Sequence, residues 1–279
     1  MNDLENQIER INLRIDKFLG DEKTKQILIN TIENRDTIRK MGFPVYILSG
    51  KCGSGCTTFS KILADIIDVY RILPKVSTNN FIEMEYPYSE VQEEYNKFFD
   101  AFRWAAETTN EFYGVALIDM FGYETNYENE RFLDLLDFIK ENKKNTVFIL
   151  RLHTFDKSRV DEIQAIIEKY SYTEQIELPH LETEEYLKYI ISKCNSSNIS
   201  FVPNEEIVLK ILKAYIDEAK KAKYFSGLHT INTFISHFTY SQMGNKNSNG
   251  KIEITEENLK ALADEFFSKM TSNYRKIGF

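Results

Sequence analysis

The sequence predicts an α/β protein, with an open, mostly parallel sheet covered by helices on both faces and a smaller helical domain after it. Two observations carry this prediction. Short apolar runs alternate with helical patterns from about residue 45 to 179, which is typical of parallel strands joined by crossover helices. After Pro179 only helical periodicity continues. The length of 279 residues suits one large domain or two modest ones.

Residues 1–41 are expected to form an N-terminal helical leader. Apolar residues recur at helical spacing from Leu4 to Leu19 and again from Ile27 to Ile38, with a break near Gly20. We therefore expect two helices in this segment.

The αβα domain is expected over residues 42–178. Its first strand, 45–49, runs into a glycine-rich loop and a helix that continues past Ile67. The remaining elements expected in this domain are strands at 81–86, 114–119, 146–152 and 175–179, and helices at about 90–108, 131–142 and 160–169.

The helical domain is expected over residues 179–279. Three of its segments open with Thr-Glu-Glu or Asn-Glu-Glu, in which a capping residue precedes acids that suit the positive end of a helix dipole. The stretch 244–251, "GNKNSNGK", is expected to be a loop.

Composition excludes several classes of protein. The net charge of -8 and the pI near 5.3 argue against a broad nucleic-acid surface. Three cysteines, an odd number in a chain of this length, indicate free thiols in a reducing compartment. No signal peptide is recognisable and no apolar run approaches the roughly 20 residues that cross a bilayer, so a cytoplasmic location without membrane contact is expected.

The stretch 50–58, "GKCGSGCTT", follows the first strand and has most features of a phosphate-binding loop. In such loops backbone N–H groups surround the phosphates, a lysine reaches the outer phosphates and a Ser or Thr hydroxyl holds Mg²⁺. Against the template G-x-x-x-x-G-K-S/T, Gly50 and Gly55 take the glycine places and Thr57 the hydroxyl place, but Cys56 replaces the lysine. A glycine-rich turn that binds no ligand is the alternative.

The apolar run "ALIDMF" ends on Asp119. In nucleotide hydrolases of this architecture an Asp at the end of such a strand helps to hold Mg²⁺. The next residue is Met120, which can neither accept a proton nor orient water. Asp119 as a simple strand-end residue is the alternative.

Five segments in this order resemble the AAA+ ATPases, and most closely the group of stage V sporulation protein K and red-type rubisco activase. They are the leader "IDKFLGDEKTKQILINTI", the Walker A segment "ILSGKCGSGCTTFSKILADII", the run from "GVALIDMF" to "TVFIL" with the Walker B and sensor 1 strands, the lid entry "IELPHLETEEYLKYI", and "FSGLHTINTFI" with sensor 2. The resemblance covers about residues 10–265 and implies an AAA+ fold.

The resemblance also implies which residues would contact a nucleotide: Gly50, Gly53, Ser54, Gly55, Cys56, Thr57, Thr58, Asp119 and His229. Thr57 and Asp119 would hold Mg²⁺ if a nucleotide binds. Several active residues of the family are missing. Cys56 stands at the Walker A lysine position, Met120 at the Walker B glutamate position and His229 at the lid arginine position, and the stretch 165–175 has no arginine.

Two further positions stay open within the resemblance. The sensor 1 strand ends in Arg151, Leu152 and His153, which leaves the sensor residue unassigned. The segment that lines the central pore in the family contains Tyr86 and Tyr88 here.

A degenerate AAA+ protein is therefore the leading interpretation. It would be hydrolytically inactive, would bind ATP or ADP and Mg²⁺ weakly or not at all, and would act as a subunit, adaptor or scaffold beside an intact relative or in a ring of its own copies. The alternatives are a weakly active ATP-dependent protein remodeller and a nucleotide sensor without turnover. Lys51 is considered as a substitute for the missing lysine, and Cys52 with Cys56 as a redox pair or metal half-site.

Overall fold

The computed structural model describes residues 3–50, 53–87, 92–106, 111–123, 130–154, 156–178, 181–202, 204–222, 225–242, 246 and 250–271. The chain divides into two compact units, one formed by residues 1–51 and 55–179 and the other by residues 52–54 and 180–279. Each unit is described by itself. Pro179 and His180, where the chain passes from one unit to the other, lie outside the described residues.

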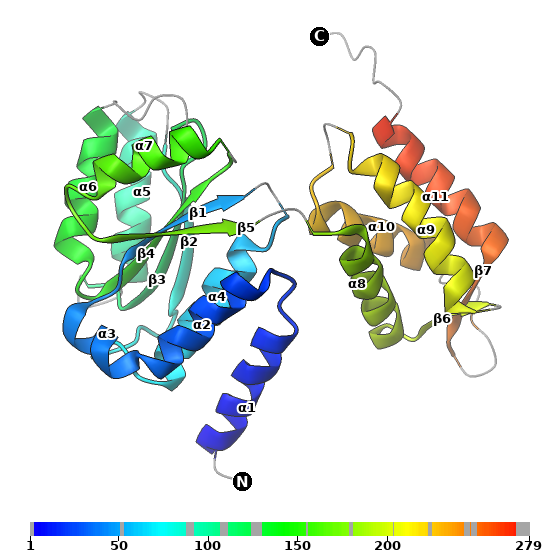
Figure 1. Cartoon of the computed structure of the whole chain (residues 1–279), viewed down its shortest axis with the longest axis horizontal. Coiled ribbons are helices and arrows are strands. Elements are labelled where there is room, and N and C mark those ends of the chain that lie inside the picture. Colours follow the sequence, from blue (N-terminus) through cyan, green and yellow to red (C-terminus); the bar gives the residue numbers. More distant parts are fainter. Residues whose placement is uncertain are drawn as a thin grey trace. The chain divides into compact units, whose positions relative to one another are not determined.

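A five-stranded sheet in the order β2-β3-β4-β1-β5 forms the centre of the first unit (Figure 1). All of its neighbouring strands are parallel, so the expected open parallel sheet is confirmed. The strands are β1 (Val45–Gly50), β2 (Phe81–Glu85), β3 (Gly114–Asp119), β4 (Thr146–Leu152) and β5 (Thr173–Leu178).

Helices cover both faces of this sheet. One face packs against α5 (Gln92–Ala105), α6 (Glu130–Asn142) and α7 (Lys157–Ile167), and the other against α1 (Asp3–Asp16), α2 (Glu22–Glu33) and α4 (Cys56–Val69) (Figure 1). Successive side chains of a strand point to opposite faces. In β4, accordingly, Phe148 and Leu150 belong to the first core and Val147 and Ile149 to the second. The unit is a three-layer αβα domain.

The leader contains three helices in place of the expected two. The additional boundary lies at Asn34, which ends α2 and precedes α3 (Arg35–Met41). The side chain of Asn34 donates a hydrogen bond to the carbonyl of Asn30 at 3.0 Å, and side-chain bonds of this kind compete with continuation of a helix. The break near Gly20 is present, and Asp21 caps the helix that follows it.

The second unit contains α8 (Thr183–Ser196), α9 (Glu205–Ala219), α10 (Leu228–Ser241) and α11 (Glu256–Thr271). It also contains two parallel strands, β6 (Ile199–Val202) and β7 (Ile252–Thr255), so the expectation of a purely helical domain was wrong on this point. Each strand has only four residues, which is too short for an alternating pattern to stand out in the sequence. Most of the loop expected at 244–251 lies outside the described residues.

The helix caps follow the expected pattern in two of three cases. Asn204 and Thr255 each accept a hydrogen bond from a backbone N–H of the first turn that follows them. Thr183 does not act as a cap, because α8 begins one residue earlier than its Thr-Glu-Glu sequence suggests and Glu182 forms a capping box with Glu185.

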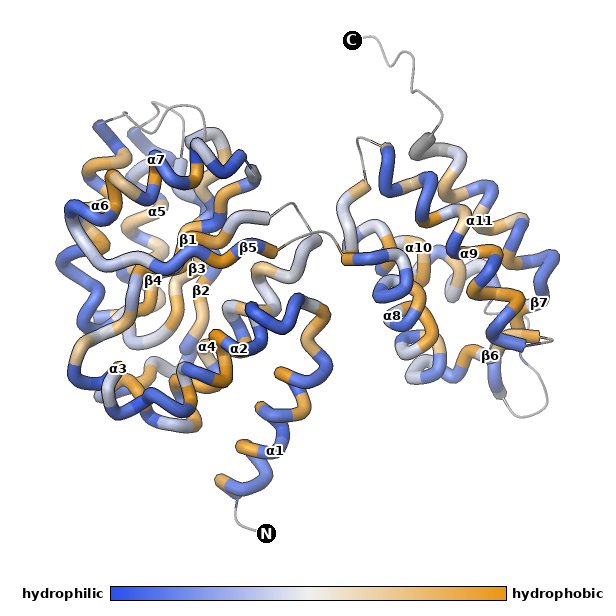
Figure 2. The backbone as a smooth tube through the Cα atoms, viewed as in Figure 1, coloured by the Kyte–Doolittle hydropathy of each residue, from blue (hydrophilic) through white to orange (hydrophobic). Residues whose placement is uncertain are grey.

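Hydropathy along the chain agrees with this packing. The helices alternate between hydrophilic and hydrophobic segments, as amphipathic helices on a core do (Figure 2). Within the described part of the chain, we find no helix whose length and apolar character would suit a membrane crossing.

Two leucines of α6 provide a direct test of this packing. Leu135 is fully buried in the core under α6, whereas Leu133, on the same helix, is 42% exposed. We expect Leu135→Ala to lower the free energy of unfolding by about 3 kcal/mol, because it removes buried methyl groups and leaves a cavity. Leu133→Ala should cost less than about 1 kcal/mol. Urea denaturation followed by circular dichroism measures both, and equal losses would contradict the assignment of α6's buried face.

Candidate functional site

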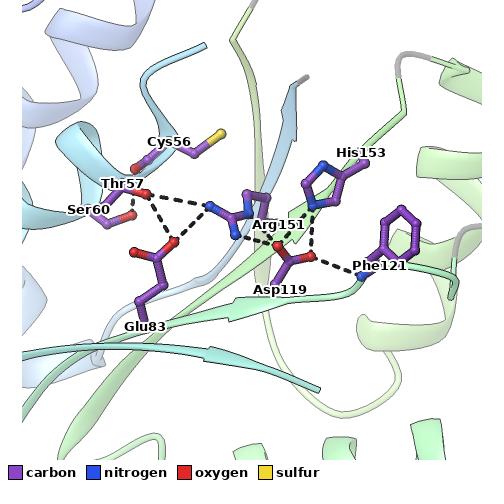
Figure 3. A network of polar contacts seen from close by, with 8 residues as sticks. All are labelled: Cys56, Thr57, Ser60, Glu83, Asp119, Phe121, Arg151 and His153. Carbon is purple, nitrogen blue, oxygen red and sulfur yellow. Dashed lines mark hydrogen bonds and ion pairs between the residues drawn. The ribbon is translucent and has the colours of Figure 1, made fainter. Parts of the chain in front are cut away.

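A network of polar side chains lies at the carboxyl ends of β2, β3 and β4 and at the beginning of α4 (Figure 3). In parallel α/β sheets this edge is where ligands bind, because the strands end there and the loops between elements converge. The network consists of Thr57, Glu83, Asp119, Arg151 and His153, all of which belong to the first unit.

The glycine loop lies between β1 and α4, as the motif requires. Gly50 ends β1, and Gly55 precedes α4 with a left-handed φ of 100°. Gly53 is left-handed as well, with φ of 81°, so both positions favour glycine. Gly53 and Ser54 cluster with the second unit. Lys51 and Cys52 lie outside the described residues, so neither the role considered for Lys51 nor a Cys52–Cys56 pair is tested.

The first turn of α4 differs from that of an active phosphate loop. Cys56, at the lysine position, is only 5% exposed and belongs to the core beneath α4. Thr57 is half-buried, and its hydroxyl donates a hydrogen bond to Glu83 Oε1 at 3.1 Å. Thr58 is exposed. Of the two threonines expected to contact a nucleotide, Thr57 therefore joins the network.

Arg151 connects all the acidic groups of the network. Its guanidinium donates to Asp119 Oδ2 through Nε at 3.0 Å and through Nη2, and to Glu83 Oε1 through Nη1 at 2.9 Å. Nη1 also lies 3.5 Å from the Thr57 hydroxyl oxygen. One side chain of this protein thus places a positive charge among the groups that a metal-bound nucleotide would need (Figure 3).

The other side of the Asp119 carboxylate is also engaged. The backbone N–H of Phe121 donates to Oδ1 at 3.0 Å, and His153 Nε2 lies 2.8 Å from Oδ1 and 3.0 Å from Oδ2. The edge of the Phe121 ring meets the His153 ring, with centroids 5.7 Å apart. An ionised carboxylate accepts about four hydrogen bonds, so donors of this chain fill the capacity of Asp119.

The pKa of Asp119 lies below its ordinary value. Burial opposes ionisation of this carboxyl, but the hydrogen bonds from His153 and Arg151 and the charge of Arg151 outweigh that effect. For Arg151, burial likewise works against the charged form, while the contacts with Asp119 and Glu83 raise its pKa overall. The pair is therefore ionised at neutral pH. Because an ionised carboxylate only accepts hydrogen bonds, His153 Nε2 carries a proton.

This arrangement does not fit Mg²⁺ as an AAA+ enzyme would hold it. Thr57 and Asp119 lie in one network, but both face the Arg151 guanidinium and the oxygens of Asp119 are fully engaged. Met120, at the Walker B glutamate position, is 1% exposed and packs in the core, so no carboxylate follows Asp119. Among the described residues, we find no group of three His, Cys, Asp or Glu side chains that could hold a metal ion.

The remaining expected residues belong to other parts of the chain. His229 is an exposed residue of α10 in the second unit, whereas the network belongs to the first. Tyr86 is not available to line a pore, because it is fully buried and its hydroxyl donates to the Arg131 carbonyl at 2.6 Å. Tyr88 lies outside the described residues.

The roles of Glu83, Arg151 and His153 in this network were not predicted from the sequence. A signal was present: Arg151 is the one charged residue in the apolar strand "TVFILRL", and a charge in such a strand requires a partner. The partner is Asp119, which lies opposite Arg151 in the parallel register of β3 and β4.

Comparison with solved structures supports the fold. No family model matches the sequence, and no curated protein matches it. Among solved structures, PCH-2 of C. elegans, an AAA+ ATPase, matches with a TM-score of 0.57 and 16% sequence identity, over 94% of this chain and 72% of that chain. In all, 338 chains of solved structures match, so the fold is widespread and does not by itself identify an activity. The chain has a fold of the AAA+ type.

The ion pair between Asp119 and Arg151 should make the stability of the protein depend on pH. We expect Asp119→Asn to lower the free energy of unfolding at pH 7 by about 2 kcal/mol, because it leaves the half-buried charge of Arg151 with fewer partners. The pKa of Asp119 is lower in the folded state than in the unfolded state. The contribution of its carboxylate to the free energy of unfolding is therefore complete above the unfolded-state pKa of about 4, and it disappears as the pH falls through the lower folded-state pKa.

The difference between the wild type and Asp119→Asn should therefore narrow by pH 3, as measured by urea denaturation at both pH values. Asp137→Asn, at an exposed position of α6, is the matched control and should change little. A difference that stays constant with pH would show that the carboxylate is not held by these charges.

Proposed function

We propose that this protein is an AAA+-type subunit that does not hydrolyse ATP and acts through contacts with other proteins, as a subunit, adaptor or scaffold of an AAA+ assembly. The observation that carries the proposal is the position of Arg151. Its guanidinium binds Asp119 and Glu83 and lies against Thr57, the groups that would otherwise be open to a metal-bound nucleotide.

The charges of the network support this proposal. Arg151 offsets one of the two negative charges of Asp119 and Glu83, and a divalent cation brought to Asp119 would meet the guanidinium at close range. Binding Mg²⁺ there would displace Arg151 from the Asp119 carboxylate, which is only 14% exposed. The displaced guanidinium would then lack an equivalent partner, which is costly for a largely buried charge.

The residues that would perform the chemistry support it as well. Cys56 cannot place a positive charge on a phosphate, and Met120 has no group to receive a proton from water. Cationic groups on a transferring phosphoryl are large contributors, since one arginine supplied in this way is worth roughly 10³- to 10⁵-fold in rate. The loss of several such groups leaves turnover near background.

The subgroup, the location and the partner that we propose follow from the resemblance of the sequence to AAA+ proteins. The order of the five motif segments supports kinship with the group of stage V sporulation protein K and red-type rubisco activase. On this basis the protein works in the cytoplasm, with an intact AAA+ relative or further copies of itself as partner. The backbone amides of the glycine loop provide weak binding of ATP or ADP at most.

ATP turnover tests the absence of hydrolysis. We expect the purified wild type to release phosphate at the rate of the buffer, with or without Mg²⁺, and Cys56→Lys to remain inactive because Met120 is still in place. Mg²⁺-dependent turnover by the wild type that Asp119→Ala abolishes would overturn the proposal and favour an ATP-dependent remodeller.

Binding of metal and nucleotide tests the role of Arg151. We expect added Mg²⁺ to leave the affinity of the wild type for ADP unchanged. In Arg151→Gln, which frees Asp119 and Glu83, Mg²⁺ should strengthen ADP binding by at least about tenfold, since two carboxylates then face the ion without an internal cation. Isothermal titration calorimetry measures both. Arg103→Gln, at an exposed arginine of α5, is the control and should behave as the wild type.

The reverse result would contradict this role. If Mg²⁺ strengthened ADP binding to the wild type as much as to Arg151→Gln, the arginine would not block the metal.

A further inference from the structure

A basic cleft lies at the opposite edge of the same sheet, where the strands begin. Its walls come from the segments before β1, β4 and β5 and from the turn after α4, and its volume is about 730 Å³. Among the described residues that line it there is no Asp or Glu, but there are five basic residues, Arg39, Lys40, Arg71, Lys143 and Lys144. We name this feature the basic cleft. The chain has a net charge of -8, so a local cluster of positive charge indicates a surface that binds an acidic ligand or partner.

Two of these cations hold the walls of the cleft together. Arg39 donates to the carbonyls of Tyr70 and Arg71 at 2.7 and 3.1 Å and pairs with Asp36 at 2.8 Å, which ties α3 to the end of α4. Lys143 Nζ lies 3.5 Å from the carbonyl of Tyr170. The shape of the cleft therefore rests on contacts within the first unit.

The other three cations are available to a ligand. Among the described residues, no carboxylate pairs with Lys40, Arg71 or Lys144. Arg71 has a left-handed φ of 49°, and its backbone is held by the hydrogen bond to Asp68 and by Arg39. The turn that carries Arg71 is thus fixed while its guanidinium stays uncommitted.

Apolar groups accompany these charges. Met41 is 83% exposed and Tyr172 is 75% exposed, and both line the cleft together with Phe43 and Pro74. Large exposed apolar side chains beside unpaired cations are typical of surfaces that bind another protein, where aromatic residues, Met and Arg are enriched.

We propose that the basic cleft is the docking site for an acidic peptide segment of a partner protein, one that carries an apolar side chain between its carboxylates. Unpaired cations match the carboxylates and set the orientation of the segment, while Met41 and Tyr172 receive the apolar side chain. The volume lies in the range of sites that enclose a small ligand or a few residues of a peptide. This proposal goes beyond the absence of hydrolysis and does not depend on it.

A nucleic acid fits the same cleft less well. Its phosphates would continue past the cleft onto the surface of a protein with pI near 5.3, where they would be repelled. The cleft also offers three unpaired cations, which is few for a binding mode that depends on many phosphate contacts.

The experiment uses the full chain and fluorescence anisotropy with a labelled octapeptide, Glu-Glu-Leu-Glu-Glu-Tyr-Glu-Glu. A peptide with Gln at every Glu position and a labelled single-stranded DNA of twelve nucleotides are the comparison probes. We expect the acidic peptide to bind at least about tenfold more tightly than the Gln peptide at low salt and to weaken as salt rises. The DNA should bind more weakly than the acidic peptide.

Two triple variants locate the binding site. The variant with Lys40→Gln, Arg71→Gln and Lys144→Gln should lose at least about tenfold in affinity for the acidic peptide. The matched control carries Arg10→Gln, Lys17→Gln and Lys157→Gln, which remove the same charge from exposed positions outside the cleft. Circular dichroism confirms that both are folded, and the control should bind as the wild type.

Three results would overturn the proposal. They are absence of binding by the acidic peptide, equal loss in both triple variants, and tighter binding of the DNA than of the peptide. The last would assign the cleft to a nucleic acid.

Discussion

The ion pair between Arg151 and Asp119 determines what this site can do. It joins the carboxyl ends of two neighbouring strands and draws Glu83 and Thr57 into the same network, while Phe121 and His153 occupy the remaining acceptor positions of Asp119. Because Asp119 and Arg151 are largely buried and oppositely charged, removing either one leaves a charge that the interior cannot solvate. The network therefore stabilises the fold with the same groups that a hydrolase would keep free.

The architecture could be predicted from the sequence, and part of the site as well. Apolar runs and glycine placement located the five parallel strands and the loop before α4, and the sequence already showed Cys56 and Met120 at the positions of the Walker A lysine and the Walker B glutamate. The break at Asn34 and the short strands β6 and β7 were missed, because a single side-chain hydrogen bond or four residues leave no periodic signal.

The contacts of Arg151 were beyond sequence reasoning for a different reason. They depend on the register of β3 with β4 and of β2 with β3, which brings together residues far apart in the chain. A lone arginine in an apolar strand shows that a partner is needed, but the partner becomes known only when the strands are aligned.

The two edges of the sheet differ in the way their charges are paired. At the carboxyl edge Arg151 pairs with both Asp119 and Glu83, whereas the amino-terminal edge leaves three cations without a carboxylate partner among the described residues. That contrast agrees with both proposals, a carboxyl edge that does not hydrolyse ATP and an amino-terminal edge that docks an acidic peptide.

A crystal structure of the wild-type protein grown with excess Mg²⁺ and ADP tests the central claim most directly. If Arg151 blocks the metal, its guanidinium remains on Asp119 and Glu83 and no metal ion is coordinated by Thr57 and Asp119, whether or not density for ADP is present at the glycine loop. A Mg²⁺ ion bound by Thr57 and Asp119, with Arg151 turned away from the carboxylate, would contradict it.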